Sequence, residues 1–385
     1  MTVWDDLVGQ EQVVGELGRA VEAAAGALGS AAGAAMAHAW LLTGPPGSGR
    51  STAARAFAAA LQCDAGGCGH CPACRTALAG TSADVELVST ALLSHGVKDM
   101  RALVQRAARH PVGGRWQVIL LEDADRLTEQ AANALLKSIE EPPARTVWLL
   151  CAPTVDDVLA TLRSRCRTLS LRTPSSAAVA EVLVRRDGID PAMAAFAARA
   201  AQGHIGRARR LARDEQARLR RAAALRVPTM LGGLSSCLEA AAELVEAASE
   251  EAKQTAEELD VREGEELRRA LGGGTQGRGL PTGAAAQLKE LERTQKTRAK
   301  RVQRDALDRA LVDLASYYRD VLCLQLGAST ELTNEEMRPQ LQKAAASSTP
   351  EQTLRRVDAV LACRTAIESN VAPLLAAEAM AVALR

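Results

Sequence analysis

Between residues 44 and 52 the sequence reads GPPGSGRST, which matches a phosphate-binding loop at every position but one. The pattern of such loops is G-x-x-x-x-G-K-[ST], and Arg50 occupies the lysine position. The glycines let backbone N–H groups approach phosphate oxygens, the cation reaches the terminal phosphates, and the next hydroxyl helps hold Mg²⁺. Arginine is charged but planar and longer, so we expect phosphate binding to survive and the geometry of hydrolysis to suffer. A glycine-rich turn without a ligand is the alternative. The residues expected to contact a nucleotide are Gly44, Pro45, Gly47, Gly49, Arg50, Ser51 and Thr52.

Two carboxylates follow the apolar segment Gln117–Leu121 and are further candidates for this nucleotide site. A hydrolysing site of this type needs an aspartate that supports Mg²⁺ and, after it, a residue that orients the attacking water. The expected order is aspartate followed by glutamate, but here Glu122 precedes Asp123. Each side chain is therefore one methylene longer or shorter than the residue expected at its position. Because a displacement of about 1 Å is costly in such sites, the sequence predicts weak or absent hydrolysis.

Four cysteines directly after the loop's helix have the spacing of a metal site, C-x4-C-x2-C-x2-C. Four thiolates form a closed tetrahedral zinc site of the structural type, without an open catalytic position. His70 is a spare donor, and four unrelated thiols are the alternative. We expect the other five cysteines to be small buried apolar residues. The predicted zinc ligands are Cys63, Cys68, Cys71 and Cys74.

Arg165 lies in an arginine-rich segment, LRSRCR, just before an apolar strand pattern. It could pair with a carboxylate of the protein or project toward phosphates. Arginines usually serve surfaces and ion pairs, so the residue alone favours the first role.

Apolar strands that alternate with helical segments position these residues in the first 172 residues. Strands separated by helices indicate a parallel sheet covered on both faces, the α/β class of a P-loop domain. From 173 onward the pattern is helical, which predicts a small helical domain over 173–225 and an all-α domain over 226–385. The strands are expected at Trp40–Gly44, Val85–Ser89, Gln117–Leu121, Thr146–Ala152 and Thr168–Leu171.

The charge changes sign within the last domain. Residues 243–268 contain ten acidic and three basic residues, residues 284–304 contain seven basic and two acidic residues, and a glycine-rich loop at 272–283 separates them. An antiparallel hairpin over about 243–304 would place the two signs side by side, while two solvated faces are the alternative. We also expect 26–37 to form a loop. Beyond the hairpin, helical spacing predicts that five residues face a core: Leu307, Leu311, Leu314, Tyr318 and Val321.

The composition restricts the function further. A net charge of +1 supplies no general attraction to nucleic acid or membrane, and 2% aromatic residues argue against base stacking. Nine cysteines without a signal sequence indicate a reducing compartment, and we expect the cytoplasm.

Five motifs in this order resemble the clamp-loader branch of the AAA+ family, and within it the δ′ type of bacterial DNA polymerase III subunit. They are DLVGQE at 6–11, the loop at 44–52, the cysteine module at 63–74, NALLKSIEEPP at 133–143 and Ser-Arg-Cys at 164–166. The resemblance covers at least residues 1–210, and the rest matches as a helical domain of fitting length.

The resemblance implies a nucleotide-binding domain, a helical lid and a helical collar that assembles five subunits into a ring. It implies as partners the τ/γ ATPase subunits, the δ subunit, the β sliding clamp and primed DNA, and no membrane. It implies structural Zn²⁺, with ATP or ADP and Mg²⁺ as further candidate cofactors. In that family the arginine of Ser-Arg-Cys reaches the ATP of the neighbouring subunit, which assigns Arg165 as a catalytic finger in trans.

Departures from the motor subunits indicate a stator that hydrolyses little and is no ATPase on its own. Ala152 occupies a polar sensor position, and Gly206 stands where the lid carries a sensing arginine. The first cysteine gap is also shorter than in the family, so the geometry of Cys63 is the least certain. One alternative is a hydrolysis-competent ATPase subunit of the same ring. The other is a zinc-dependent nucleic-acid adaptor, although the module has only Arg75 as a nearby base.

Overall fold

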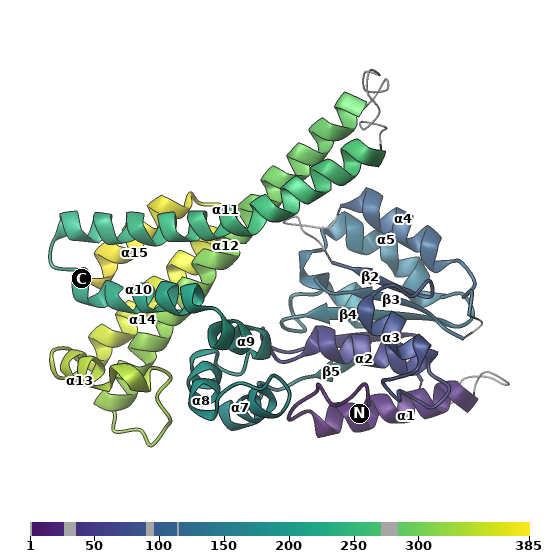
Figure 1. Ribbon diagram of the computed structural model, residues 1–385, viewed down its shortest axis with the longest axis horizontal. Coiled ribbons are helices and arrows are strands. Elements are labelled where there is room, and N and C mark those ends of the chain that lie inside the picture. The colour runs from purple at the N-terminus through teal and green to yellow at the C-terminus, as the bar shows by residue number, and fades with distance from the viewer. Residues whose placement is uncertain (1, 27–35, 90–95, 114, 271–283) are drawn as a thin grey trace. The chain divides into compact units, whose positions relative to one another are not determined.

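The structure, a computed structural model, describes residues 2–26, 36–89, 96–113, 115–270 and 284–385 of the chain (Figure 1). The chain divides into two compact units, Met1–Ala212 and Arg213–Arg385. The expected boundary at 172/173 falls inside the first unit, and the finer division into three domains stays a prediction. Most of the expected loops at 26–37 and 272–283 lies outside the described residues.

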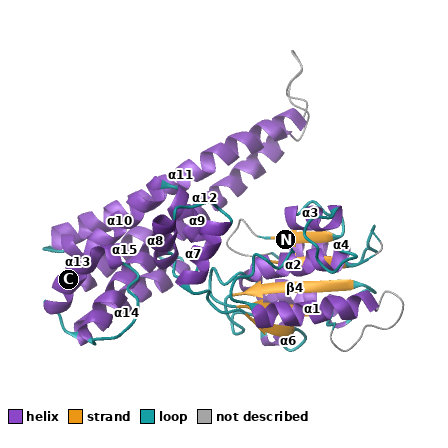
Figure 2. Ribbon diagram, turned by 60° about the horizontal axis from the view of Figure 1, so that its bottom comes forward, coloured by secondary structure: helices purple, strands orange, loops and turns teal. Residues whose placement is uncertain are grey.

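A five-stranded parallel sheet forms the centre of the first unit and confirms the predicted fold class (Figure 2). The strand order is β2-β3-β4-β1-β5, and each strand differs by at most one residue at either end from its predicted range. The strands are β1 Ala39–Thr43, β2 Val85–Val88, β3 Gln117–Leu121, β4 Thr146–Ala152 and β5 Arg167–Ser170.

Strand side chains alternate between two buried faces, which explains why the strands read as continuous apolar runs. Trp40 and Leu42 face the cluster that contains α1 and α2, whereas Leu41 and Trp148 face the cluster that contains α4 and α5. The helices of this part are α1 Glu11–Gly26, α2 Arg50–Gln62, α3 Pro72–Ala79, α4 Val97–Ala107, α5 Glu129–Glu140 and α6 Ala160–Arg163, with the 3₁₀ turn η1 Ala124–Arg126.

Three short helices complete the first unit. Ser175 accepts a hydrogen bond from the backbone N–H of Ala178, and Asp190 caps the next helix in the same way. These caps satisfy N–H groups that a helix end leaves unpaired. The helices are α7 Ser176–Arg185, α8 Pro191–Ala200 and α9 Ile205–Arg213.

Among its described residues the second unit is built from helices joined by short irregular segments, as predicted. Leu307, Leu311, Leu314, Tyr318 and Val321 are buried in its core, which confirms the predicted face. None of the described helices is both long enough and apolar enough to span a bilayer. The elements are α10 Glu215–Met230, α11 Leu234–Ala270, α12 Ala284–Gln325, η2 Glu335–Met337, α13 Arg338–Ala346, α14 Pro350–Glu368 and α15 Pro373–Leu384.

α11 packs against α12 in the part of the chain for which the charged hairpin, about 243–304, was predicted. Arg298 on α12 forms ion pairs with Asp260 and Glu263 on α11. These pairs raise the pKa of Arg298 and lower that of Glu263, since each charge stabilises the other.

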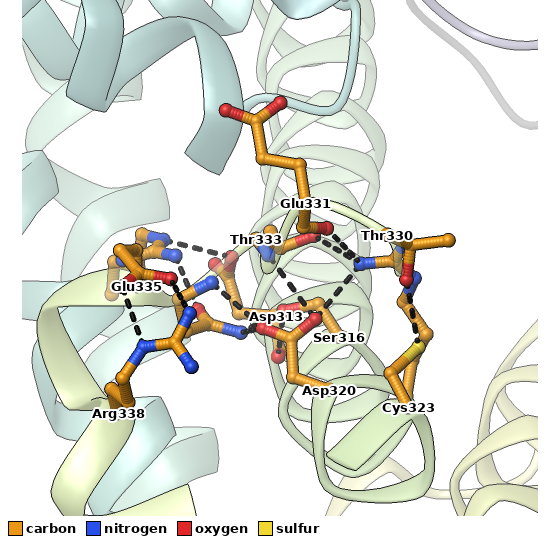
Figure 3. Close-up of polar contacts among 12 residues, drawn as sticks. Asp313, Ser316, Asp320, Cys323, Thr330, Glu331, Thr333, Glu335 and Arg338 are labelled. Carbon is orange, nitrogen blue, oxygen red and sulfur yellow. Dashed lines mark hydrogen bonds and ion pairs between the residues drawn. The ribbon is translucent and has the colours of Figure 1, made fainter. Parts of the chain in front are cut away.

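A buried polar network joins α12 to the segment before α13 (Figure 3). Asp320, fully buried, accepts hydrogen bonds from the backbone N–H groups of Thr333 and Asn334 at 3.1 and 2.7 Å. The side-chain amide of Asn334 donates to Asp320 and to Ser316. The network holds this irregular segment against the core because its buried backbone N–H groups have no partner in a helix or strand.

We expect Asp320→Ala to destabilise the protein by about 2–3 kcal/mol, because it leaves two buried N–H groups unsatisfied. Glu331→Ala is the matched control, since its exposed carboxylate points away from the network in Figure 3. Urea unfolding of both variants measures the difference. Equal stability of the two variants would contradict a structural role for Asp320.

Candidate functional site

The phosphate-binding loop connects the carboxyl end of β1 to the amino end of α2, as predicted. Gly44, Gly47 and Gly49 have φ values of 152°, 87° and 93°, a region that side chains with a Cβ disfavour. Gly49 stands at the N-cap of α2 and supplies no side-chain hydrogen bond. The first backbone N–H groups of α2 are therefore available for an anion, as at other helix N-termini.

A cavity of about 400 Å³ lies over this loop and reaches the lid segment. His204 forms part of its wall and packs so closely on the loop that a Cβ on Gly47 would come within 2.5 Å of it. Gln10 also connects the loop to the segment after β5, because its side-chain amide donates to the backbone carbonyls of Ser48 and Arg172 at 3.2 and 2.6 Å. Neither His204 nor Gln10 was predicted to have a role, although Gln10 belongs to the DLVGQE motif.

Two buried polar atoms of the loop fit a phosphate ligand. Nη1 of Arg50 and Oγ of Ser48 have no hydrogen-bond partner in the described part of the chain. Burial lowers the pKa of Arg50, and the negative charges of its surroundings act in the opposite direction. An unsatisfied buried guanidinium nitrogen is costly, and an anion in the cradle would satisfy it. Arg50, Ser48 and the backbone N–H groups would hold the phosphates, and Ser51 and Thr52 also line the cavity.

Glu122 forms an ion pair with Arg55 of α2, at 2.7 Å between Nη2 and Oε1. The Nε of Arg55 donates to the same oxygen at 3.0 Å. Glu122 is 16% exposed and lies at the carboxyl end of β3, beside Asp123. Its charge is thus already compensated by a residue 67 positions earlier in the chain. The sequence pattern predicted neither this ion pair nor any role for Arg55.

The four predicted cysteine ligands come together, with their sulfurs all within 4.8 Å of one another. The Sγ of Cys63 lies 3.7 Å from that of Cys68 and 3.8 Å from that of Cys71. A tetrahedral ZnS₄ site with bonds of about 2.3 Å has edges of about 3.8 Å, so the group fits zinc. These separations are far longer than the roughly 2 Å of a disulfide. Cys63 takes its place in the cluster despite the short gap after it.

Local backbone geometry shapes the cysteine cluster. Gly66, Gly67 and Gly69 all have positive φ, as expected of glycines in tight turns. Although burial alone raises it, backbone N–H groups from Cys68, Gly67 and Ala65 lower the pKa of Cys63 to about 6. Burial raises the pKa of Cys74. A low pKa favours the thiolate that a metal binds.

His70 and the other cysteines take no part in this cluster. The ring of His70 contacts the carbonyl of Cys68 through Nδ1. The prediction that the remaining cysteines are small buried residues is confirmed for three and holds in part for the two half-buried ones. Cys151, Cys237 and Cys363 are buried, and Cys166 and Cys323 are half-buried.

Arg165 lies at the opposite end of the sheet from the loop. Strands β1 and β5 are parallel, with Trp40 opposite Arg167 and Thr43 opposite Ser170. The loop follows the carboxyl end of β1, whereas Arg165 precedes the amino end of β5. The four residue steps from Trp40 to Gly44 correspond to about 13 Å of extended chain. Arg165 is therefore remote from the phosphate cradle of its own chain.

The first part of the chain is similar to known proteins. Residues 27–175 match the family model described as DNA polymerase III, delta subunit. A DNA polymerase III subunit delta' of Pseudomonas aeruginosa is 40% identical over 167 residues, 41% of this chain and 50% of that protein. The delta' subunit of Escherichia coli is 37% identical over 143 residues, 36% of this chain and 43% of that protein.

A subunit gamma/tau of Mycobacterium tuberculosis is 34% identical over 165 residues, 42% of this chain and 27% of that protein. The chain thus spans half or less of the length of each of these relatives. The matched family segment contains the loop, all four clustered cysteines and Arg165. Over residues 27–175 the chain is therefore similar to the family described as DNA polymerase III, delta subunit.

Proposed function

We propose that the chain is a δ′-type subunit of a bacterial clamp loader. It binds a nucleotide without appreciable hydrolysis and acts as a stator within a hetero-oligomeric ring. Through Arg165 it serves the ATP of a neighbouring τ/γ subunit, while the δ subunit, the β clamp and primed DNA complete the assembly. A structural zinc ion occupies the four-cysteine cluster. The relatives' names and the matched family segment support this assignment.

The topology of Arg165 is the observation that carries the proposal. Because Arg165 stands at the amino edge of the parallel sheet and the loop at the carboxyl edge, it has no access to a nucleotide bound in its own chain. Its side chain is nevertheless 35% exposed and positively charged. Any phosphate that an arginine placed in this way stabilises belongs to another subunit, which supports the role of a finger in trans.

The surroundings of the loop support the stator role. Arg50 replaces the lysine that such loops direct to the terminal phosphates, and the swap changes reach and shape. Glu122 is engaged by Arg55, which competes with any function in orienting water or holding Mg²⁺. Both features preserve an anion site and oppose hydrolysis in it.

The purified chain is expected to bind ADP or ATP and to release no phosphate above background. Arg50→Ala should weaken nucleotide binding about 10- to 100-fold, because it removes a buried charged donor. Arg75→Ala, an exposed arginine of the cysteine module, is the control and should bind as wild type. Fluorescent-nucleotide anisotropy measures binding, and a phosphate-release assay measures turnover. Turnover that Asp123→Ala abolishes would favour the active ATPase instead.

A further inference from the structure

The guanidinium of Arg165 is held by Glu140, the last residue of α5. The two residues belong to separate motifs, NALLKSIEEPP and Ser-Arg-Cys, that are 25 positions apart. We propose that Glu140 is a positioning residue that orients Arg165 toward the phosphates of the neighbouring subunit. The inference rests on the trans role proposed for Arg165 and adds a residue to it.

The contacts fix the guanidinium from two sides. Nε of Arg165 donates to Oε1 of Glu140, and Nη2 pairs with the same carboxylate. Nη1 donates to the carbonyl of Thr161 at 2.7 Å and contacts Oγ of Ser164 at 3.2 Å. A charged acceptor on one edge and a backbone carbonyl on the other leave the planar group little rotational freedom.

One donor of the guanidinium remains for a phosphate. Arginine has five N–H groups in a fixed fork. Glu140 engages Nε and one N–H of Nη2, and Thr161 and Ser164 accept from Nη1. The second N–H of Nη2 is therefore the donor left for a phosphate oxygen, and the fixed group carries its positive charge with it.

Glu140 has no evident use in its own helix. A carboxylate at a helix C-terminus faces the negative end of the helix dipole, which is unfavourable. Glu141 adds a second negative charge next to it. The ion pair with Arg165 offsets this local cost, which is a physical reason for a glutamate at a position where a cation would stabilise the helix better.

The chain offers a matched control at the next residue. Glu141 is also exposed, and among the described residues it forms no ion pair with Arg165. Replacing it removes the same charge from the same helix end without touching the guanidinium. Loss of charge and loss of the specific contact can therefore be separated.

The test measures steady-state ATP turnover of the complex reconstituted with the τ/γ and δ subunits, β clamp and primed DNA. Glu140→Ala is expected to lower kcat about 10- to 100-fold with little change in KM for ATP, because the finger is present but misplaced. Glu140→Gln keeps an acceptor oxygen and should lose less. Glu141→Ala should match wild type. Size-exclusion chromatography checks that each variant assembles.

A double variant distinguishes an effect of Glu140 that acts through Arg165 from an effect of Glu140 that is independent of Arg165. If Glu140 acts through Arg165, adding Glu140→Ala to Arg165→Ala should cause no further loss of kcat. An additional loss in the double variant, or wild-type kcat in Glu140→Ala while Arg165→Ala is impaired, would overturn the inference and leave the trans role intact. Wild-type kcat in Arg165→Ala would instead refute the proposed function itself.

Discussion

Replacing Arg165 by alanine is expected to lower the ATP turnover of the assembled complex by about 10³-fold while the complex still forms. A finger in trans stabilises the charge that develops on the transferred phosphoryl group, and its removal is typically worth 10³ or more in rate. The corresponding loss is about 4 kcal/mol of transition-state stabilisation. The measurement is clamp- and DNA-stimulated ATPase activity of the reconstituted complex, with wild-type and variant chains compared at equal concentrations.

Two further variants make this experiment specific. Arg165→Lys retains the charge but not the planar fork, so it should recover only part of the activity. Arg163→Ala, two residues earlier, removes an arginine that pairs with Asp156 and is 39% exposed. Since its partner is an exposed carboxylate of the same chain, its loss should leave turnover near wild type. An Arg165→Ala complex with undiminished turnover would rule out the trans role.

Loss of one zinc ligand is expected to have the largest effect on stability. Structural zinc sites contribute roughly 10 kcal/mol or more of apparent binding free energy, which is coupled to folding of the module. Cys63→Ser removes a sulfur that lies 3.7 and 3.8 Å from two of its partners. We expect the purified variant to contain less than one zinc per chain and to unfold at least about 10 °C below wild type.

The zinc experiment has a control within the chain. Cys323 is half-buried in the second unit and lies outside the four-cysteine cluster. Cys323→Ser should therefore keep full zinc content as measured by atomic absorption. Removal of metal from the wild-type chain by a chelator should reproduce the low melting temperature of Cys63→Ser. A wild-type chain that purifies without zinc, and is unaffected by the chelator, would contradict a metal site.

Features set by short sequence spacings were predictable. The strands follow from apolar runs between helical segments, and the loop from glycines at fixed intervals, because periodicity and positive φ are local properties. The cysteine cluster was predictable for the same reason, since its members lie within 12 residues. Even so, the doubt about Cys63 was resolved only by the fold, which places its sulfur beside the other three.

Features set by long-range contacts were not predictable from the pattern. Glu122 and Arg55 are 67 positions apart, and nothing in the local sequence of either indicates the other. Gln10 bridges to a residue 162 positions away, which gives the DLVGQE motif a physical role. For Arg165, the residue alone left an ion pair and a phosphate contact as alternatives. The structure shows an ion pair with an exposed glutamate that is compatible with both.

From the sequence alone one can predict a parallel α/β sheet, a glycine-rich loop of phosphate-binding pattern with an arginine at the lysine position, and a cluster of four thiols. These depend on residue types at short, fixed intervals. Which edge of the sheet each charged residue occupies follows only from the strand order and register of the folded chain. Strand order and parallel register place the loop at one edge and Arg165 with Glu140 at the other. That separation arises from contacts between distant segments, which no local spacing encodes.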